Sequence, residues 1–333
     1  MNNWFEKTSS LDTVVISSRI RIARNIKNYP FTNRMDKSHI DSINELIISA
    51  IKNNKSGLFD DFKVFNLNDD IQNHIWIDKN IITPDILNNN QNKILILSKD
   101  ENISITICAE DHIRLNFISG GMDLDISYNI LDKIDNALNE VIPFAYDDNL
   151  GYLTESLTNI GTGLKASLFL HLPGLKRLGE ISSLKEYLSK IGLSIKNAFS
   201  EDTDFKSCVY ELSNNVTLGI TEIAALENLK SVAAQIIAKE NNARYSLDRF
   251  SLEEEINEAM QKLLNAETLN YNEALSLLSE IKLGISLGII ENISSDIPFM
   301  LMINSRENIL KSLKISKDDI NIQRANYIRN NIK

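Results

Sequence analysis

Between Val14 and Asn25 the chain reads VVISSRIRIARN, a run of β-branched residues interrupted by serine and arginine. Successive side chains of an extended strand point to opposite faces of its sheet. One face would be mostly apolar and would carry Ile16, Ser18, Ile20 and Ile22. The other would be polar and would carry Ser17, Arg19 and Arg21. The run therefore predicts a strand that buries one face and presents two arginines side by side on the other.

Strand-like and helical patterns alternate up to about Arg244. The strand-like runs are KILILSKD, ISITICAEDHIRLNFISGG and LKASLFLHLP, and the second predicts two strands around a tight turn at Ala109–Asp111. In DISYNILDKIDNALNEVI, apolar residues recur every three or four positions, at Ile126, Ile130, Ile134, Ala137, Leu138 and Val141. TEIAALENLKSVAAQIIAKE has the same period and predicts a second, longer helix. Together these patterns predict an α+β domain.

After Arg244 the patterns are helical only. Ser251 followed by Glu254, and Asn270 followed by Glu273, are both typical of a capping box at a helix start. Two further helices are expected at Ser305–Leu313 and Lys317–Ile332. We therefore expect an α+β domain at residues 1–246 and a smaller all-helical domain at residues 247–333.

The composition limits the partners. A net charge of -10 argues against nucleic acid as the main partner, so any anionic ligand must be held by a local cluster of cations. The two cysteines, Cys108 and Cys208, are too few for a disulfide framework and lack metal-ligand spacing, which fits a reducing cytosol. No signal peptide and no membrane-spanning stretch is evident. A cytoplasmic protein is expected.

Two loops carry residues suited to chemistry. Gly161 and Gly163, in TNIGTGLKAS, precede a strand, where free backbone N–H groups can hold an oxyanion. The stretch matches neither the P-loop nor the dinucleotide fingerprint, and protein kinase signatures are absent. In AEDHIR, Glu110 and Arg114 could approach one site, whereas His112 has no second histidine at ligand spacing and is expected to be structural.

Four stretches, SSRIRIARN, EDHIR, LGYLTESLTNIGTGLKAS and SNNVTLG, occur in the order and spacing of the ATP:guanido phosphotransferases, or phosphagen kinases. The chain resembles this family over nearly its whole length, without the extra N-terminal helical domain of creatine and arginine kinases. The stretches IDKNIITPDI, YNEALSLLSEIKLGISLGII and QRANYIR are similar to the bacterial protein-arginine kinases, which act in stress response and protein quality control.

The resemblance implies a fold and a reaction. It implies an antiparallel sheet flanked by helices, with ATP lying across the sheet and its γ-phosphoryl passing to arginine side chains of proteins. Arginine suits phosphate because its planar fork binds two oxygens and keeps its charge. The nucleotide-binding positions that it implies are Ser17, Ser18, Arg19, Ile20, Arg21, Asn80, Arg114, Lys165, Ala166, Ser167, Leu168, Phe169, Lys196, Asn197, Ala198, Phe199, Ser200 and Glu201. Mg²⁺ would bridge the phosphates, with no dedicated protein ligands expected.

The acceptor requires a base. A guanidinium has a pKa above ~12 and becomes a nucleophile only when a proton is removed. By resemblance Glu110 is the candidate base, and Glu201 is a second carboxylate that orients the substrate. Ser156 stands where the family carries a reactive cysteine that orients and polarises the guanidinium.

Several positions depart from the family pattern. Ser156 and Leu157 replace cysteine and proline, Lys165 and Lys196 replace arginines, Asn80 replaces a histidine, and Ala109 replaces the first of two acids. These changes predict a slow or inactive relative in which ATP binding is better preserved than turnover. In the stretch INIQRA, Ile320 and Asn321 replace the arginine and aspartate of a phosphoarginine-binding motif, so this regulatory site is expected to be weak or absent. Arg324 would then be a surface residue near a C-terminal helix end.

The expected partners are protein substrates phosphorylated on arginine, a zinc-finger-type activator, a Clp-type protease and a second copy of the chain, with no nucleic acid and no membrane. Two other functions remain open. One is an ATP-binding pseudokinase that regulates a partner without catalysis, and the other is a small-molecule guanidino kinase.

Overall fold

The computed structural model describes residues 4–6, 14–67, 71–87, 92–199, 207–313 and 319–332. Its central element is a sheet with the strand order β2-β3-β4-β5-β1-β8-β10-β9. In that order the strands are Lys63–Leu67, Lys93–Leu97, Ile103–Ile107, Ile113–Gly120, Val15–Arg24, Leu164–His171, Val209–Asn214 and Leu193–Asn197. All neighbouring pairs are antiparallel, which confirms the expected sheet. The predicted turn between β4 and β5 is also confirmed, since Cys108 N donates to His112 O across it.

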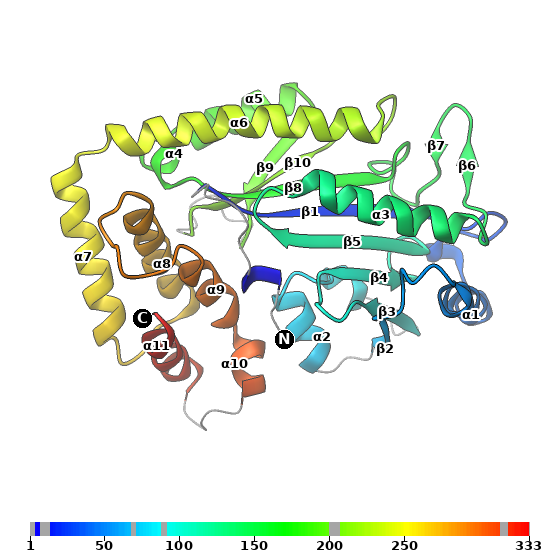
Figure 1. Cartoon of the computed structure of the whole chain (residues 1–333), viewed down its shortest axis with the longest axis horizontal. Coiled ribbons are helices and arrows are strands. Elements are labelled where there is room, and N and C mark those ends of the chain that lie inside the picture. The colour runs from blue at the N-terminus through cyan, green and yellow to red at the C-terminus, as the bar shows by residue number, and fades with distance from the viewer. Residues whose placement is uncertain are drawn as a thin grey trace.

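Helices α3, Leu124–Asn139, and α6, Glu222–Ser246, run across one face of this sheet (Figure 1). The largest apolar core lies between them and the sheet. The remaining elements before α7 are α1 Lys37–Asn53, α2 Ile71–Asp78, α4 Pro173–Arg177, α5 Ile181–Lys190, the short hairpin of β6 Tyr146–Asp147 and β7 Gly151–Tyr152, and 3-10 turns at Trp4–Glu6, Thr32–Arg34 and Pro84–Leu87.

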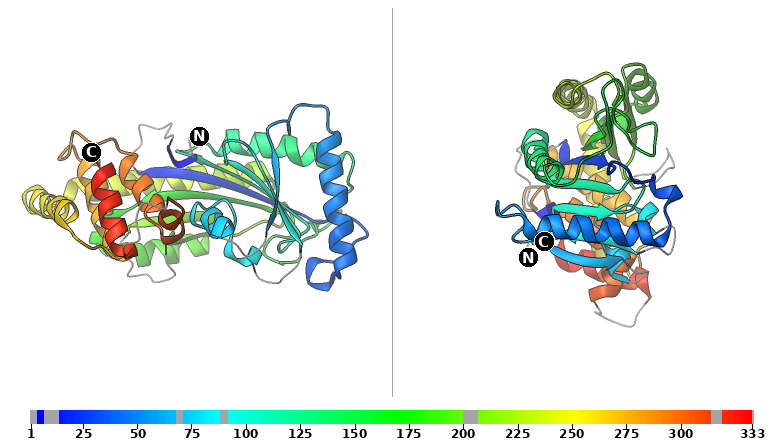
Figure 2. Two further views of the ribbon diagram at one scale, coloured as in Figure 1. Left: turned by 90° about the horizontal axis from the view of Figure 1, so that it is seen from below. Right: turned by 90° about the vertical axis from the view of Figure 1, so that its right-hand side faces the viewer.

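The C-terminal part is helical, as predicted. Its helices are α7 Arg249–Asn265, α8 Tyr271–Ser286, α9 Ile297–Asn304, α10 Glu307–Leu313 and α11 Ile320–Asn331. They gather at one end of the sheet, opposite to α1 (Figure 1 and Figure 2). The division into domains 1–246 and 247–333 stays a prediction. Among the described residues, no helix combines the length and apolarity needed to cross a membrane.

The predicted faces of β1 need one correction. Ile20 and Ile22 lie in the core beneath α3 and α6, but Ile16 packs in the second core, with the C-terminal helices. The pairing of β1 with β8 shifts between Val15 and Ser17. A bulge of this kind inserts one residue and reverses the alternation beyond it, so Val15 takes the core position expected for Ile16.

The helix starts were predicted with mixed success. Asn270 caps α8 in the predicted capping box, because Glu273 N donates to Asn270 Oδ1 and Asn270 N donates to Glu273 Oε2. The box predicted at Ser251 is wrong. Helix α7 begins three residues earlier, since the Asp248 carboxylate accepts a hydrogen bond from Ser251 N and caps the helix there.

The buried face of α3 also differs from the prediction. Ile134 and Leu138 are buried as predicted, but Ile126 and Val141 are 60% and 61% exposed, and Leu131 is buried although it was not predicted. Asp135 is buried on that face as well, because Arg24 donates to it through Nε and Nη2. A polar residue in the contact surface is invisible to a pattern based on apolar residues. Helix α9 was not predicted, and α10 and α11 begin two and three residues later than expected.

Candidate active site

The face of the sheet opposite to α3 and α6 is polar and cationic. In the antiparallel register, Arg21 of β1 lies beside Lys165 of β8, and Arg19 lies beside Ser167. Residues directly opposite one another project their side chains from the same face, about 5 Å apart. Arg114 of β5 pairs with Ala23 and therefore projects from this face too. The alternation of β1 thus places its arginines among cations supplied by its neighbours. We call this the cationic face; its cations are Arg19, Arg21, Arg114, Lys165 and Lys196.

Three of these cations line one narrow cavity. Arg19, Arg21 and Arg114 lie around it with Asn80 and Thr83 from the segment that follows α2. Asn80 has a φ of 58°, a left-handed conformation that asparagine tolerates better than most residues. Arg114 Nη1 donates to Thr83 Oγ1 at 2.8 Å, which ties this segment to the sheet. The structure therefore brings four of the predicted nucleotide-binding residues together.

Glu211 of β10 is the counter-ion of the cationic face, and the sequence analysis missed it. Its carboxylate is 4% exposed and accepts from Arg19 Nη2 at 2.6 Å, while Lys196 Nζ lies 3.3 Å away. Burial alone would raise the pKa of Glu211, but Arg19, Arg21 and Lys196 outweigh burial and hold that pKa well below its usual range. Glu211 is therefore ionised and fixes the direction of Arg19.

The cationic face still has an excess of positive charge. Burial first, and then the charge of Arg21, lower the pKa of Lys165, which forms no ion pair with the described residues. Nε of Arg19 is buried and has no hydrogen-bond partner among them. A lysine crowded by arginines and an unused guanidinium donor both favour binding of a polyanion. The residues present therefore suit a chain of phosphates.

Glu110 lies at the edge of the cationic face, at the turn between β4 and β5. Its carboxylate is 39% exposed and accepts from Arg114 Nη2 at 2.9 Å. The neighbouring Asp111 is fully buried and anchors two other segments. Its Oδ1 accepts from Asn25 Nδ2 at 2.7 Å and from Glu155 N at 2.8 Å. This second contact brings the segment that contains Ser156 next to Glu110, so two of the predicted catalytic residues belong to adjacent segments.

His112 and Ser156 have local partners. Nδ1 of His112 accepts from Ile26 N at 2.9 Å, and its Nε2 lies 2.8 Å from Pro30 O. Both ring nitrogens are therefore used in the fold, as expected for a structural histidine. Burial lowers the pKa of His112, so the ring is neutral. The hydroxyl of Ser156 contacts Thr158 Oγ1 at 2.8 Å.

Not every predicted nucleotide-binding residue reaches the cationic face. Alternation along β1 and β8 turns some side chains to the other face, under α3 and α6: Ser18, Ile20, Ala166 and Leu168. Of the predicted segments in these two strands, only the alternate side chains Ser17, Arg19, Arg21, Lys165, Ser167 and Phe169 project from the cationic face. Strand geometry sets which face each side chain takes, and nucleotide binding at these positions stays a prediction.

The segment after β9 leaves the sheet beyond Ala198, whose N still donates to Val209 O of β10 at 2.9 Å. Asn197 accepts a hydrogen bond from Phe199 N, and Ala198 and Phe199 pack with the C-terminal helices. The guanidinium of Arg306 lies over the Phe199 ring at 5.2 Å. Ser200 and Glu201 lie outside the described residues, so their predicted roles have no structural description. Among the described residues, no group of three His, Cys, Asp or Glu side chains could hold a metal ion.

Arg324 is not the surface residue that was expected. It is 3% exposed and lies in the first half of α11. Its Nε donates to Ser305 O and its Nη1 donates to Leu269 O, both at 2.9 Å. The side chain therefore joins α11 to the loops that follow α9 and α7, and the prediction of an exposed cation at a helix C-terminus is wrong.

The fold is that of the guanidino kinases, as comparison with solved structures shows. The duplicated taurocyamine kinase from Schistosoma mansoni, with bound transition state analog components, matches with a TM-score of 0.63 and 20% identity over 80% of this chain. This chain covers 42% of that one. A lombricine kinase matches with a TM-score of 0.62 and 18% identity, over 73% of this chain and 71% of its own.

Sequence comparison identifies the family. Residues 42–243 match the C-terminal catalytic domain of ATP:guanido phosphotransferases, and residues 249–333 match the C-terminal domain of protein-arginine kinase McsB. The protein-arginine kinase of Clostridium acetobutylicum is 35% identical, with both chains fully covered. That of Caldanaerobacter subterraneus is 36% identical over 83% of this chain and 84% of its own. The chain belongs to the ATP:guanido phosphotransferase family, which confirms the resemblance inferred from its motifs.

Proposed function

We propose that this protein is a protein-arginine kinase that transfers the γ-phosphoryl group of ATP to arginine side chains of other proteins. The observation that carries the proposal is the cationic face, where three arginines line one cavity beside the carboxylate of Glu110. The chain is 35% and 34% identical to two curated protein-arginine kinases over almost its whole length. This similarity supports a protein-arginine kinase over a pseudokinase or a small-molecule guanidino kinase.

In this proposal the cations hold and neutralise the triphosphate. Arg19, Arg21 and Arg114 bind phosphate oxygens, and Lys165 and Lys196 add charge without a bidentate fork. Phosphoryl transfer depends mainly on positioning and charge neutralisation. Mg²⁺ bound to the phosphate oxygens would supply further neutralisation. Among the described residues no cluster of metal ligands is present. Glu211 keeps Arg19 directed into the cavity.

The proposed base is Glu110. It orients the acceptor guanidinium and takes a proton from the nitrogen that attacks phosphorus. Its carboxylate is paired with Arg114. Phosphate oxygens that bind Arg114 compete for the same guanidinium donors, so nucleotide binding would free the Glu110 carboxylate for the acceptor. Ser156, a neutral hydroxyl in place of a thiolate, would contribute less to orientation and makes a slow rate the expected one.

The first test is phosphorylation by the purified protein. With ATP and Mg²⁺, we expect acid-labile phosphate on an arginine-rich protein and none on free arginine. Glu110→Gln should lower kcat by 10²–10⁴-fold, on the order of what a general base contributes, without weakening ATP binding. Glu45→Gln, which changes an exposed carboxylate on α1, is the matched control.

Three outcomes would contradict parts of the proposal. Label on neither acceptor with ATP binding retained would indicate a pseudokinase. Label on free arginine would indicate a small-molecule kinase. Unchanged turnover in Glu110→Gln would remove Glu110 from the role of base.

The other expected partners remain proposals. They are a zinc-finger-type activator, a Clp-type protease that receives the phosphorylated proteins, and a homodimer formed through the helical part. We also propose a cytoplasmic location and a role for Glu201 as a second substrate carboxylate.

A further inference from the structure

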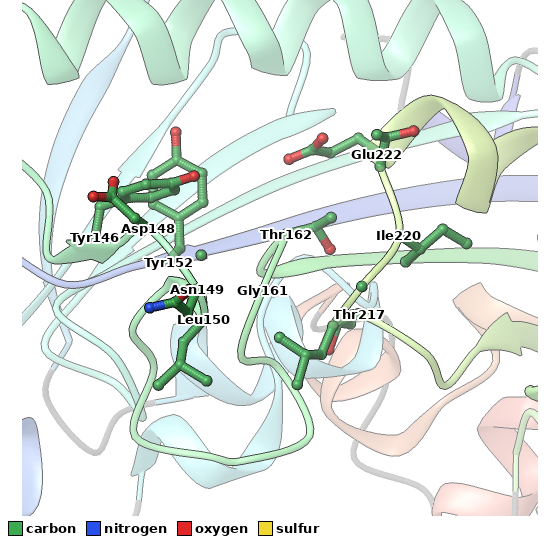
Figure 3. Close-up of a pocket in the computed structure, with 14 residues that line it drawn as sticks. Tyr146, Asp148, Asn149, Leu150, Tyr152, Gly161, Thr162, Thr217, Ile220 and Glu222 are labelled. Atoms are coloured by element: carbon green, nitrogen blue, oxygen red, sulfur yellow. The ribbon is translucent and has the colours of Figure 1, made fainter.

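A second cavity, of about 490 Å³, lies away from the cationic face. It is bounded by the β6–β7 hairpin, by the loop that leads into β8 and by the start of α6 (Figure 3). It shares no lining residue with the cavity of the three arginines. Its volume is within the range of ligand-binding pockets.

The floor of this cavity is built from closely packed backbone. Gly161 has a φ of 109°, and a Cβ there would lie 2.1 Å from Thr217 O. A Cβ on Gly151 would lie 2.6 Å from Gly161 O. Thr162 N donates to Thr217 O at 2.9 Å, and Thr217 Oγ1 donates to Ile160 O at 2.7 Å. The cavity is thus a preformed feature of three joined segments.

Two carboxylates lie on opposite sides of the cavity. Asp148 is on the hairpin side and Glu222 is at the first turn of α6 (Figure 3). Neither carboxylate forms a hydrogen bond or an ion pair within the described part of the chain. The start of α6 contributes about half a positive charge, which two full negative charges exceed. Arg24 is nearby, but its charge is taken up by the buried Asp135. The cavity therefore favours a cation.

Tyrosine rings form the wall beside Asp148. Tyr146 and Tyr152 are in edge contact, with ring centroids 5.3 Å apart. The Tyr152 ring already binds a guanidinium, since Arg24 Cζ lies 3.4 Å from its centroid. Tyr146 is 58% exposed and presents its ring to an incoming group. Aromatic rings bind cations through their π-faces, so this wall reinforces the charge preference.

The rim identifies the kind of ligand. Leu150 of the β6–β7 hairpin and Leu218 of the segment before α6 both line the cavity and are 43% and 49% exposed. A free metal ion or small amine would leave these side chains in water. A basic side chain that projects from a polypeptide would bring neighbouring residues to cover them.

We propose that this cavity binds an arginine or lysine side chain from a segment of a protein substrate, with the flanking residues of that segment on the Tyr146, Leu150 and Leu218 rim. The identity of the occupant as a substrate rests on the proposed kinase function. The preference for a basic peptide rests only on the cavity. The cavity would hold one basic residue of a substrate while another enters the active site, and so would favour proteins with several basic residues.

Binding is tested by fluorescence anisotropy with a labelled peptide that carries one lysine between leucines. Lysine cannot accept a phosphoryl group as arginine does, so binding is measured without the reaction. We expect the double variant Asp148→Asn/Glu222→Gln to weaken binding about tenfold or more, and binding to fall with added salt. The same peptide with glutamine for lysine should not bind.

The controls separate this cavity from the active site. Glu186→Gln/Glu227→Gln removes two exposed carboxylates elsewhere and should bind like the wild type. Glu110→Gln should also bind like the wild type. Equal affinity in the double variant and the wild type would overturn the proposal, as would loss of binding in Glu110→Gln alone. If the double variant does not fold, the single variant Tyr146→Leu is measured instead and should weaken binding several-fold. An unchanged affinity of Tyr146→Leu for the peptide would also overturn the proposal.

Kinetics test the connection to the proposed function. The double variant should raise KM for a protein with many basic residues and leave kcat unchanged. Its KM for a short peptide with a single arginine should not change. If the protein transfers no phosphoryl group at all, the kinase function fails while the anisotropy result still decides whether the cavity binds basic segments.

Discussion

Two buried glutamates show what single residues contribute to the site and to the fold. Glu211 neutralises Arg19 and Lys196 on the cationic face. Glu240 on α6 is fully buried, forms an ion pair with Arg244 and accepts from the backbone N–H groups of Gly174 and Leu175. Removing one member of a buried ion pair costs about 3–5 kcal/mol, because the other charge is left uncompensated. Only the cations around Glu211 have a second counter-ion available, namely the proposed nucleotide.

Glu211→Gln should therefore lower the free energy of unfolding by about 3 kcal/mol without ATP. Saturating ATP should restore part of that loss, since phosphate replaces the carboxylate as counter-ion, and the ATP-induced rise in Tm should exceed that of the wild type. Glu240→Gln is the matched control, with a comparable loss and no extra rescue. Thermal unfolding with and without ATP measures both. Equal ATP-induced shifts in the two variants would contradict the assignment of the nucleotide to the cationic face.

At the residue scale, the sequence could predict the cations but not their partner. The alternation of β1 is local, so Arg19 and Arg21 are visible within a few positions. Glu211 is 192 residues from Arg19 in the sequence, and only the strand order brings them together. The anchoring role of Asp111 was missed for the same reason, because it bonds to groups 86 and 44 residues away. Long-range partners of this kind have no short-range pattern.

At the scale of elements, the loop before β8 depends on glycines without space for a side chain. Gly161 lies against the backbone of Thr217, in the segment that leads to α6. Gly179 also has a positive φ, of 72°, but a Cβ there would meet nothing within 4 Å. The two positions thus separate the cost of backbone conformation from the cost of steric overlap.

Gly179→Ala should cost about 1–2 kcal/mol of unfolding free energy, the usual penalty of a left-handed conformation. Gly161→Ala should cost clearly more, about 3 kcal/mol or above, because the new methyl group would also lie 2.1 Å from a carbonyl oxygen. It should also abolish peptide binding in the neighbouring cavity. Urea unfolding of both variants tests the difference, and equal losses would show that the loop can move to accept the methyl group.

The elements themselves were predicted well where local chemistry decides them. The Asn270–Glu273 box sets the start of α8, and the turn between β4 and β5 follows from the strand patterns on either side. The face of Ile16 was wrong because a bulge depends on the pairing with β8, and no residue of β1 indicates it alone. The start of α7 was wrong because Asp248 and Ser251 are both competent caps, and the structure uses the first.

At the scale of the molecule, a buried polar cluster joins the sheet to the C-terminal helices. His171, at the end of β8, is fully buried, and its Nε2 lies 2.9 Å from Ser279 Oγ of α8. Arg244 of α6 donates to His171 O at 2.8 Å. The charge of Lys282 on α8 also acts on the His171 ring. The general arrangement of a sheet domain and a helical part followed from the change of pattern after Arg244. This contact between them did not, because a single histidine in a strand has no periodic pattern.

The buried histidine makes the stability of the molecule depend on pH. Burial, and then the charges of Arg244 and Lys282, hold the pKa of His171 well below 6.5. As pH falls below about 6.5, the unfolded chain binds a proton at this position and the folded chain does not. Stability from this group is therefore complete above that pH and is lost as pH falls, by up to about 1.4 kcal/mol per pH unit.

Urea unfolding at pH 7.5, 6.5 and 5.5 should show this loss, and His171→Gln should show a slope smaller by about that amount. His112, whose pKa burial also lowers, contributes to the slope that remains in the variant. Equal slopes in both proteins would mean that the cluster opens and admits a charged ring.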